Sequence, residues 1–175
     1  MSVADGPGQP AGTPAEAAVG GFEWNDALSV GITAIDDDHK AFFELASLLH
    51  SAQAAGGEHS VIDSALSMLE EYILGHFLRE EKAMAAVGYP RLADHQEAHR
   101  RFREKARAVV EEHQQGAPDA AIGLPSLVDT WLRQHIAHDD QAYTNWISAA
   151  VVDRRPLVYL AMEAEDAADA GADQD

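Results

Sequence analysis

The chain has 175 residues, 46% of them hydrophobic, so it can bury a core and is expected to form one domain. Its 30 acidic residues outnumber 12 basic ones and give a net charge of −18, which disfavours nucleic acid and anionic membranes as partners. The absence of cysteine excludes disulfides, a thiolate zinc site and a cysteine nucleophile, so any metal must be held by imidazole and carboxylate groups.

The N-terminal segment 1–21 is mostly Gly, Pro and Ala, a composition that cannot bury enough apolar area to offset the entropy of ordering. We expect a flexible tail there. A secretory signal needs a positively charged start and an apolar run, but the first basic residue is Lys40. No uninterrupted apolar run reaches the roughly 18 residues of a membrane span. We therefore expect a cytoplasmic protein with no membrane or nucleic-acid partner.

The first predicted helix covers 36–55 and starts at Asp36, whose carboxylate can cap backbone N–H groups. The pair Gly56-Gly57 is predicted to end it. His39 lies in its first turns, and on its own it is as consistent with a capping or surface histidine as with a metal ligand. Trp24, ahead of the helix, is predicted to anchor the chain on the core.

The second predicted helix, 60–87, has a polar pair within its apolar stripe. His76 and Glu80 are four positions apart, so they lie about 40° apart around the helix axis and share one face. A buried carboxylate is costly unless it is paired or bound to a metal, so this pair indicates a metal site. Arg79 and Glu81 are predicted to belong to a solvated face.

The third predicted helix, 90–115, repeats this spacing with His95 and His99. Gly88 and Pro90 stand between the two pairs and are typical helix stop and restart signals. The second and third helices should therefore run antiparallel, with their ligand faces toward each other.

The fourth predicted helix begins near Leu124, with Pro125 at its first helical position. His135 lies in its apolar stripe and is followed by Asp139 and Asp140. Helix geometry alone favours Asp139 as the partner of His135, because Asp139 lies about 40° around the axis from it and Asp140 about 140°.

Four amphipathic helices joined by short links predict an all-α fold, an up-down-up-down four-helix bundle. After the fourth helix comes a short apolar run, and then an acidic stretch without a basic residue that reads as a solvated tail. The predicted organisation is a flexible tail at 1–21, the bundle at 22–155 and an acidic tail at 156–175.

The core-facing histidines and carboxylates of the four helices are best explained by a metal cluster, because so many polar groups are costly to bury singly. Two six-coordinate ions offer twelve positions. Five imidazoles, two bridging carboxylates and one bridging solvent oxygen fill eleven and leave one open for a small ligand. Imidazole with carboxylate suits iron better than calcium or magnesium.

Several motifs resemble the hemerythrin family, in particular the single-domain bacteriohemerythrins. They are Ile35-Asp36 with His39-Lys40, HFLREEKAM from 76, GYPRLADHQEAH from 88 and WLRQHIAHDD from 131, and the resemblance spans about 24–146. It implies two iron ions (Fe2+ or Fe3+) joined by an oxo or hydroxo bridge, with dioxygen as the ligand. The long tails at either end have no counterpart in the family core.

The resemblance also implies roles for individual residues. One iron would be held by His95, His99 and His135, the other by His39 and His76, with Glu80 and Asp140 as bridges. The second iron is the one with the open position. The apolar wall around the bound oxygen would comprise Phe77, Trp131, Leu132 and Ile136. The histidines without a ligand role, predicted to lie at the surface, are His50, His59, His113 and His138. For the second bridge we follow the resemblance, and so expect Asp140 rather than Asp139.

The leading functional hypothesis is a binding protein, not an enzyme, that stores, carries or supplies oxygen to a recipient the sequence does not name. The first alternative is a di-iron enzyme such as a ferroxidase or a scavenger of peroxide or nitric oxide. Ferritin-like enzymes of that kind use Glu-x-x-His motifs, and this chain contains none. The second alternative is an oxygen or redox sensor domain, which would need a separate partner because neither tail is long enough to be an output module.

Overall fold

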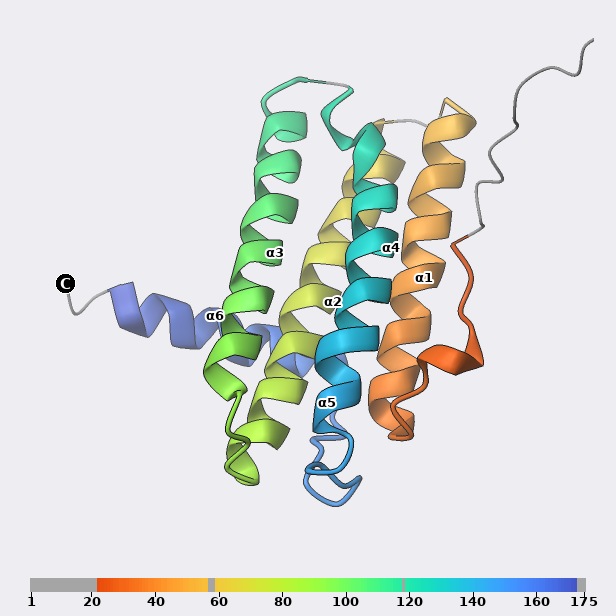
Figure 1. The fold of residues 1–175 in the computed structure, drawn as a ribbon. Helices are drawn as coiled ribbons and strands as arrows, with labels where there is room; N and C mark the ends of the chain where they lie inside the picture. The colour runs from red at the N-terminus through yellow and green to blue at the C-terminus, as the bar shows by residue number, and fades with distance from the viewer. Residues whose placement is uncertain (1–21, 57–58, 118, 173–175) are drawn as a thin grey trace, which may run out of the picture.

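A computed structural model describes residues 22–56, 59–117 and 119–172, and over these residues it is helical without a strand. Four helices run side by side in alternating directions (Figure 1), so the predicted up-down-up-down bundle is confirmed. They are α1 (Thr33–Ala54), α2 (His59–Ala86), α3 (Leu92–Gln114) and α4 (Leu124–His135). The other elements are the 3-10 turns Asp26–Leu28 and Ala120–Gly123, the π-helical turn Ile136–Asp140, α5 (Gln141–Tyr143) and α6 (Leu157–Ala172).

Helix α1 begins three residues before the predicted start. Asp36 lies within its first turn and accepts hydrogen bonds from the loop that precedes the helix. Its carboxylate accepts hydrogen bonds from the Val30 amide at 2.8 Å and from the Ser29 hydroxyl at 2.6 Å. These bonds hold the preceding loop against the helix, while the position before Thr33 has no side-chain cap.

The turn between α2 and α3 makes the two helices antiparallel, as predicted. Gly88 adopts a φ of +64°, a left-handed conformation that favours glycine. The Tyr89 amide then donates to the carbonyl of Met84 at 3.0 Å, which satisfies one of the last carbonyls of α2.

The interior of the bundle is one continuous apolar core. Its largest fully buried side chains include Phe43, Phe77, Leu132, Ile136 and Tyr143. Polar groups are buried within the core as well, and most of them gather at one level of the bundle. That level is the candidate functional site.

The C-terminal segment corrects one prediction. Residues 157–172 form α6, which crosses α2 (Figure 1), so the expectation of a solvated tail from 156 onward is wrong for this stretch. Leu157, Leu160 and Ala161 are buried and give α6 an apolar face. Gly75 makes the close approach possible, because a Cβ at that position would lie 2.5 Å from the carbonyl oxygen of Leu157. The predicted N-terminal tail, 1–21, lies outside the described residues.

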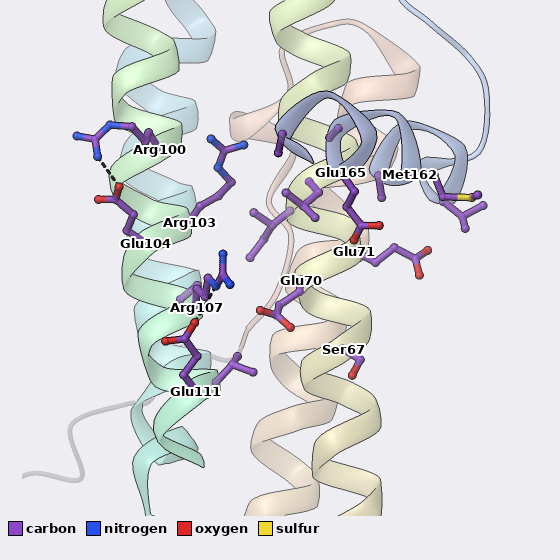
Figure 2. Close-up of a pocket in the computed structure, with 18 of the residues that line it drawn as sticks. Ser67, Glu70, Glu71, Arg100, Arg103, Glu104, Arg107, Glu111, Met162 and Glu165 are labelled. Carbon is purple, nitrogen blue, oxygen red and sulfur yellow. Dashed lines mark hydrogen bonds and ion pairs between the residues drawn. The ribbon is translucent and has the colours of Figure 1, made fainter. Parts of the chain in front are cut away.

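A groove of about 830 Å³ lies between α2, α3 and α6 (Figure 2). Its lining includes the buried apolar residues Ile73, Ala106 and Val110 and charged side chains such as Arg103 and Glu70. None of the predicted metal ligands lines this groove. Among the described helices, none combines the length and the apolar character needed to cross a membrane.

Candidate metal centre

Seven side chains meet at one level of the core, and each is at most 4% exposed. Every helix of the bundle contributes at least one of them. Helix α1 supplies one, α2 two, α3 two, α4 one, and the π-helical turn one. In chain order they are His39, His76, Glu80, His95, His99, His135 and Asp140. The structure therefore brings together all the side chains that the sequence analysis singled out as ligands.

Three imidazoles converge on one point. Nε2 of His135 lies 3.0 Å from Nε2 of His99 and 3.3 Å from Nε2 of His95. With metal–nitrogen bonds of about 2.1 Å, ligands at right angles are about 3.0 Å apart and tetrahedral ligands about 3.4 Å apart. The two measured separations lie within this range, so the three nitrogens are close enough to bind one metal ion.

The other two imidazoles form a second group with Glu80. The ligand atoms of this second group, His39, His76 and Glu80, lie within 4.8 Å of one another. The ligand atoms of Glu80 and the three converging histidines also lie within 4.8 Å of one another. Oε2 of Glu80 is 3.3 Å from Nε2 of His95 and 3.6 Å from Nε2 of His76. Glu80 is thus common to both groups, which is the position of a bridging carboxylate.

Asp140 also reaches both groups. Its Oδ1 lies 3.1 Å from Nε2 of His135, and its Oδ2 lies 3.3 Å from Nε2 of His39. The π-helical turn explains why a residue five positions after His135 returns to the same side. Hydrogen bonds in a π-helix run over five residues instead of four, so the angle calculated for a regular α-helix does not apply.

Unpartnered polar atoms indicate that the cluster is built for a ligand. Both ring nitrogens of His39, Nε2 of His76 and both carboxylate oxygens of Asp140 are buried without a hydrogen-bond partner among the described residues. Leaving such groups unpaired is costly in an apolar core. Metal ions bound by the carboxylate oxygens and by one nitrogen of each imidazole would remove most of this cost, so the donor set fits the pair of irons that the resemblance implies.

Three outer carboxylates contact the imidazoles from behind, two of them not foreseen from the sequence, and two side chains lie elsewhere than predicted. Asp38 lies 3.2 Å from Nδ1 of His76, Glu81 lies 2.9 Å from Nδ1 of His99, and Asp139 lies 3.2 Å from Nδ1 of His135. Carboxylates in this position orient an imidazole and direct its Nε2 lone pair toward a metal. Glu81 is therefore half-buried against a candidate ligand instead of lying on a solvated face.

Arg79, also predicted to be solvated, is buried and donates to both oxygens of Asp38. Of the three contacts, only that of Asp139 could be predicted from the sequence, because Asp139 lies four residues after His135 on the same helix face. The Asp38 and Glu81 contacts join different helices, so they depend on how the helices are rotated against each other.

Electrostatics keep both shared carboxylates charged. Burial alone would raise the pKa of Glu80, but His76, His95 and His99 outweigh it and hold that pKa well below its usual value. Burial and the nearby Glu80 would raise the pKa of Asp140, yet His135 and His39 keep it low. Ionised carboxylates are the form that a bridging ligand must take.

The imidazoles differ in their protonation in the absence of metal. Burial lowers the pKa of His135, but Asp140 and Asp139 overcome this and raise it to about 10. Burial dominates at His99 and lowers its pKa despite the nearby Glu80 and Glu81. A metal ion must therefore displace a proton from His135 on binding.

Tyr143 adds a hydrogen-bond donor that the sequence analysis did not identify. Its hydroxyl donates to Oε1 of Glu80, leaving Oε2 facing the imidazoles. Burial raises the pKa of the Tyr143 hydroxyl well above its usual value, and Glu80 and Asp140 add to the effect. The phenol therefore keeps its proton and orients Glu80.

The sequence profile of the hemerythrin HHE cation binding domain matches residues 30–147. The chain belongs to the hemerythrin family. It is 36% identical over 122 residues to the bacteriohemerythrin of Pseudomonas paraeruginosa strain PA7, covering 70% of this chain and 78% of that protein. It is 32% identical over 126 residues to the bacteriohemerythrin of Stenotrophomonas maltophilia, covering 72% and 81% respectively.

Solved structures agree with this assignment. The crystal structure of a hemerythrin carrying a leucine-to-tyrosine substitution superposes with a TM-score of 0.66 at 27% sequence identity, covering 70% of this chain and 94% of that one. The hemerythrin match ends before α6, which begins at Leu157, so α6 is an addition to the matched span.

Aromatic rings enclose the cluster of this hemerythrin domain. Phe77 stacks on His99 with ring centroids 3.7 Å apart, and Trp131 stacks on His135 at 4.3 Å. Trp24 lies over His39 at 6.3 Å, in keeping with its predicted role as an anchor. The other two residues predicted to line the pocket, Leu132 and Ile136, are buried in the same core. Water is thus excluded from the cluster on several sides.

The remaining histidines show one further error in the sequence analysis. His50 and His138 are exposed, as predicted, and Nδ1 of His138 lies 2.8 Å from the Gln134 carbonyl oxygen. His113 is buried instead, with Nε2 2.9 Å from Asp63 of α2, because the end of α3 packs inward there. The side chain of His59 lies outside the description.

Proposed function

We propose that this chain binds two iron ions in the histidine cluster and uses them to bind dioxygen reversibly. The observation that carries the proposal is the convergence of two imidazole groups on two shared, buried carboxylates. His95, His99 and His135 would hold one iron. His39 and His76 would hold the other. Glu80 and Asp140 would bridge them, together with an oxo or hydroxo group from solvent.

The inequality of the two groups suggests where oxygen binds. Three imidazoles would serve one ion and two the other, so the ion held by His39 and His76 would be the one with room for a further ligand. When bound, the iron pair supplies the electrons that oxygen capture requires. Storage, transport or supply of oxygen are all consistent with such a centre.

The side chains of the protein have three tasks in this proposal. The outer carboxylates Asp38, Glu81 and Asp139 orient imidazoles through their Nδ1 atoms. Tyr143 keeps a proton at its hydroxyl and holds Glu80 in place. The aromatic and aliphatic wall would exclude water and protons from the cluster when it holds metal.

The deciding experiment is a cycle of oxygenation and evacuation on the diferrous protein, with the absorption spectrum followed by stopped flow. We expect two irons per chain and full recovery of the diferrous spectrum after evacuation. Conversion to the diferric form with release of peroxide would instead indicate an oxidising enzyme. One metal ion per chain, or zinc in protein made in iron-replete cells, would contradict the proposed cofactor.

A further inference from the structure

Arg79 connects the segment that leads into α6 with another helix of the bundle. Its Nη2 donates to the carbonyl oxygen of Arg155 at 2.5 Å, two residues before α6 begins. Its Nη1 donates to both carboxylate oxygens of Asp38 on α1. One guanidinium therefore joins the C-terminal segment to α1, although the two lie far apart in the sequence.

Asp38 continues the connection to the histidine cluster. Its Oδ2 lies 3.2 Å from Nδ1 of His76, and Nε2 of the same ring lies 3.6 Å from Oε2 of Glu80. A carboxylate at Nδ1 sets the ring orientation and makes Nε2 a better donor to a metal. A displacement of Asp38 would therefore change how His76 presents its Nε2 atom.

Burial makes this connection sensitive to the loss of any partner. Arg79 is 4% exposed and Asp38 is 6% exposed. Nε of Arg79 has no hydrogen-bond partner within the described part of the chain, and the contact of Nη1 with the Ala34 carbonyl is long, at 3.4 Å. The guanidinium thus depends on Asp38 and on the Arg155 carbonyl. A buried ion pair that loses one of its few partners is strongly destabilised, in contrast to an exposed pair.

Helix α6 is attached to the bundle through α2. The Leu157 main chain rests on Gly75, and Glu163 accepts hydrogen bonds from Lys82 at 2.7 Å and from Arg155 at 2.6 Å. The groove in Figure 2 separates α6 from α3. Release of α6 would therefore free the Arg155 carbonyl from Arg79 while the four-helix core stays assembled.

We propose that Arg79 is a positioning residue for the metal centre, and that docking of α6 sets the orientation of His76 through Arg79 and Asp38. Such coupling is reciprocal, so a change at Asp38 must also alter how firmly α6 is docked. The link between α6 and Asp38 stands on contacts within the protein. Its consequence for the metal rests on the proposed function.

The first test reads the docking of α6 in the metal-free, full-length chain by hydrogen exchange. Asp38→Asn should speed exchange of the α6 amides about tenfold relative to the α3 amides, within the usual range for coupled sites. Asp37→Asn is the matched control, because Asp37 is the neighbouring residue and its side chain is 61% exposed. Equal α6 exchange in the two variants would overturn the proposal, and so would an equal acceleration in α3.

Arg79→Lys provides a second variant for this test should Asp38→Asn not fold. Lysine keeps the charge but lacks the planar fork that reaches Asp38 and the Arg155 carbonyl together. Faster α6 exchange is expected again. Unchanged exchange would contradict the assigned role of Arg79.

The second test starts from α6 and reads the metal centre of the iron-loaded chain. Leu160→Asp should release α6, since Leu160 is fully buried, whereas Tyr159→Asp introduces the same charge at a side chain that is 58% exposed. Leu160→Asp should shift the iron absorption spectrum and speed iron loss to a chelator about tenfold. Combination with Asp38→Asn should add nothing, because both changes break one connection. Spectra that match those of Tyr159→Asp, or additive effects, would exclude the coupling.

The two tests separate this proposal from the function. If the chain binds no iron, metal analysis contradicts the proposed function, while hydrogen exchange still decides whether α6 and Asp38 are linked. If iron binds and Leu160→Asp leaves the centre unchanged, the function stands and the coupling is wrong.

Discussion

His135 lies between two consecutive carboxylates, with Oδ1 of Asp140 3.1 Å from its Nε2 and Oδ2 of Asp139 3.2 Å from its Nδ1. The π-helical turn Ile136–Asp140 makes this possible, because it directs the fifth residue after His135 into the core. Asp139 stays at the edge, 3.7 Å from Arg91, with its side chain 33% exposed. Adjacent aspartates thus have different environments and different expected roles.

The first prediction separates these roles. Asp140→Ala should abolish the proposed di-iron centre, because it removes a buried group shared by both imidazole groups. Asp139→Ala should keep the centre but weaken metal affinity by about 10- to 100-fold, the usual effect of losing an outer carboxylate. Iron content and the absorption of the oxygenated protein measure both effects. A centre that survives in Asp140→Ala and is lost in Asp139→Ala would show that the regular-helix argument was the better guide.

The second prediction concerns His39. His39→Ala should prevent reversible oxygenation while the bundle still folds, because His39 belongs to the group with fewer imidazoles. His50→Ala is the matched control, since His50 is exposed on the same helix. Helicity by circular dichroism and the oxygenated spectrum are compared for the two. If His39→Ala bleaches normally on deoxygenation, the assignment of His39 is wrong.

The third prediction concerns the contact beneath α6. Gly75→Ala should lower the free energy of unfolding by about 1–3 kcal/mol, because its Cβ would overlap the Leu157 carbonyl and force α6 away from α2. Gly123→Ala is the control, because a Cβ there meets nothing within 4 Å. Denaturant midpoints measured on both variants give the comparison, and similar midpoints would mean that α6 accommodates the methyl group.

The fourth prediction is a loss of α6 docking in acid. Arg155 lowers the pKa of Asp153, and Lys82 and Arg155 lower the pKa of Glu163. Because both pKa values are lower in the folded state, these pairs stabilise docking fully above the unfolded values of about 4 and progressively less as the pH falls below them. Hydrogen exchange of α6 should therefore accelerate between about pH 4 and pH 2, relative to α3.

A double variant tests the origin of that acid effect. Asp153→Asn with Glu163→Gln should make the ratio of α6 to α3 exchange nearly independent of pH over this range. High salt should weaken docking in the original chain only, because the pairs are partly exposed and therefore screened. An acid acceleration that persists in the double variant would assign it to other carboxylates.

Much of the fold and the candidate site was determined by local patterns in the sequence. Apolar residues at helical spacing defined the four helices, and the four-residue spacing of His76 with Glu80 and of His95 with His99 placed each pair on one face. These features depend on the geometry of a single helix, so a sequence is enough to predict them. The motif resemblance supplied the choice of Asp140, for which local geometry gave the opposite answer.

Tertiary structure decided the features that depend on contacts between helices. Asp38 reaches His76 across 38 residues, and Glu81 reaches His99 across 18, so their roles follow from the rotation and packing of separate helices. Arg79 is buried with partners from two separate segments, Asp38 of α1 and the Arg155 carbonyl before α6. Periodicity within one helix contains no information about such partners. The packing of α6 on α2 likewise depends on tertiary structure, because Gly75 leaves room for Leu157 at the start of α6.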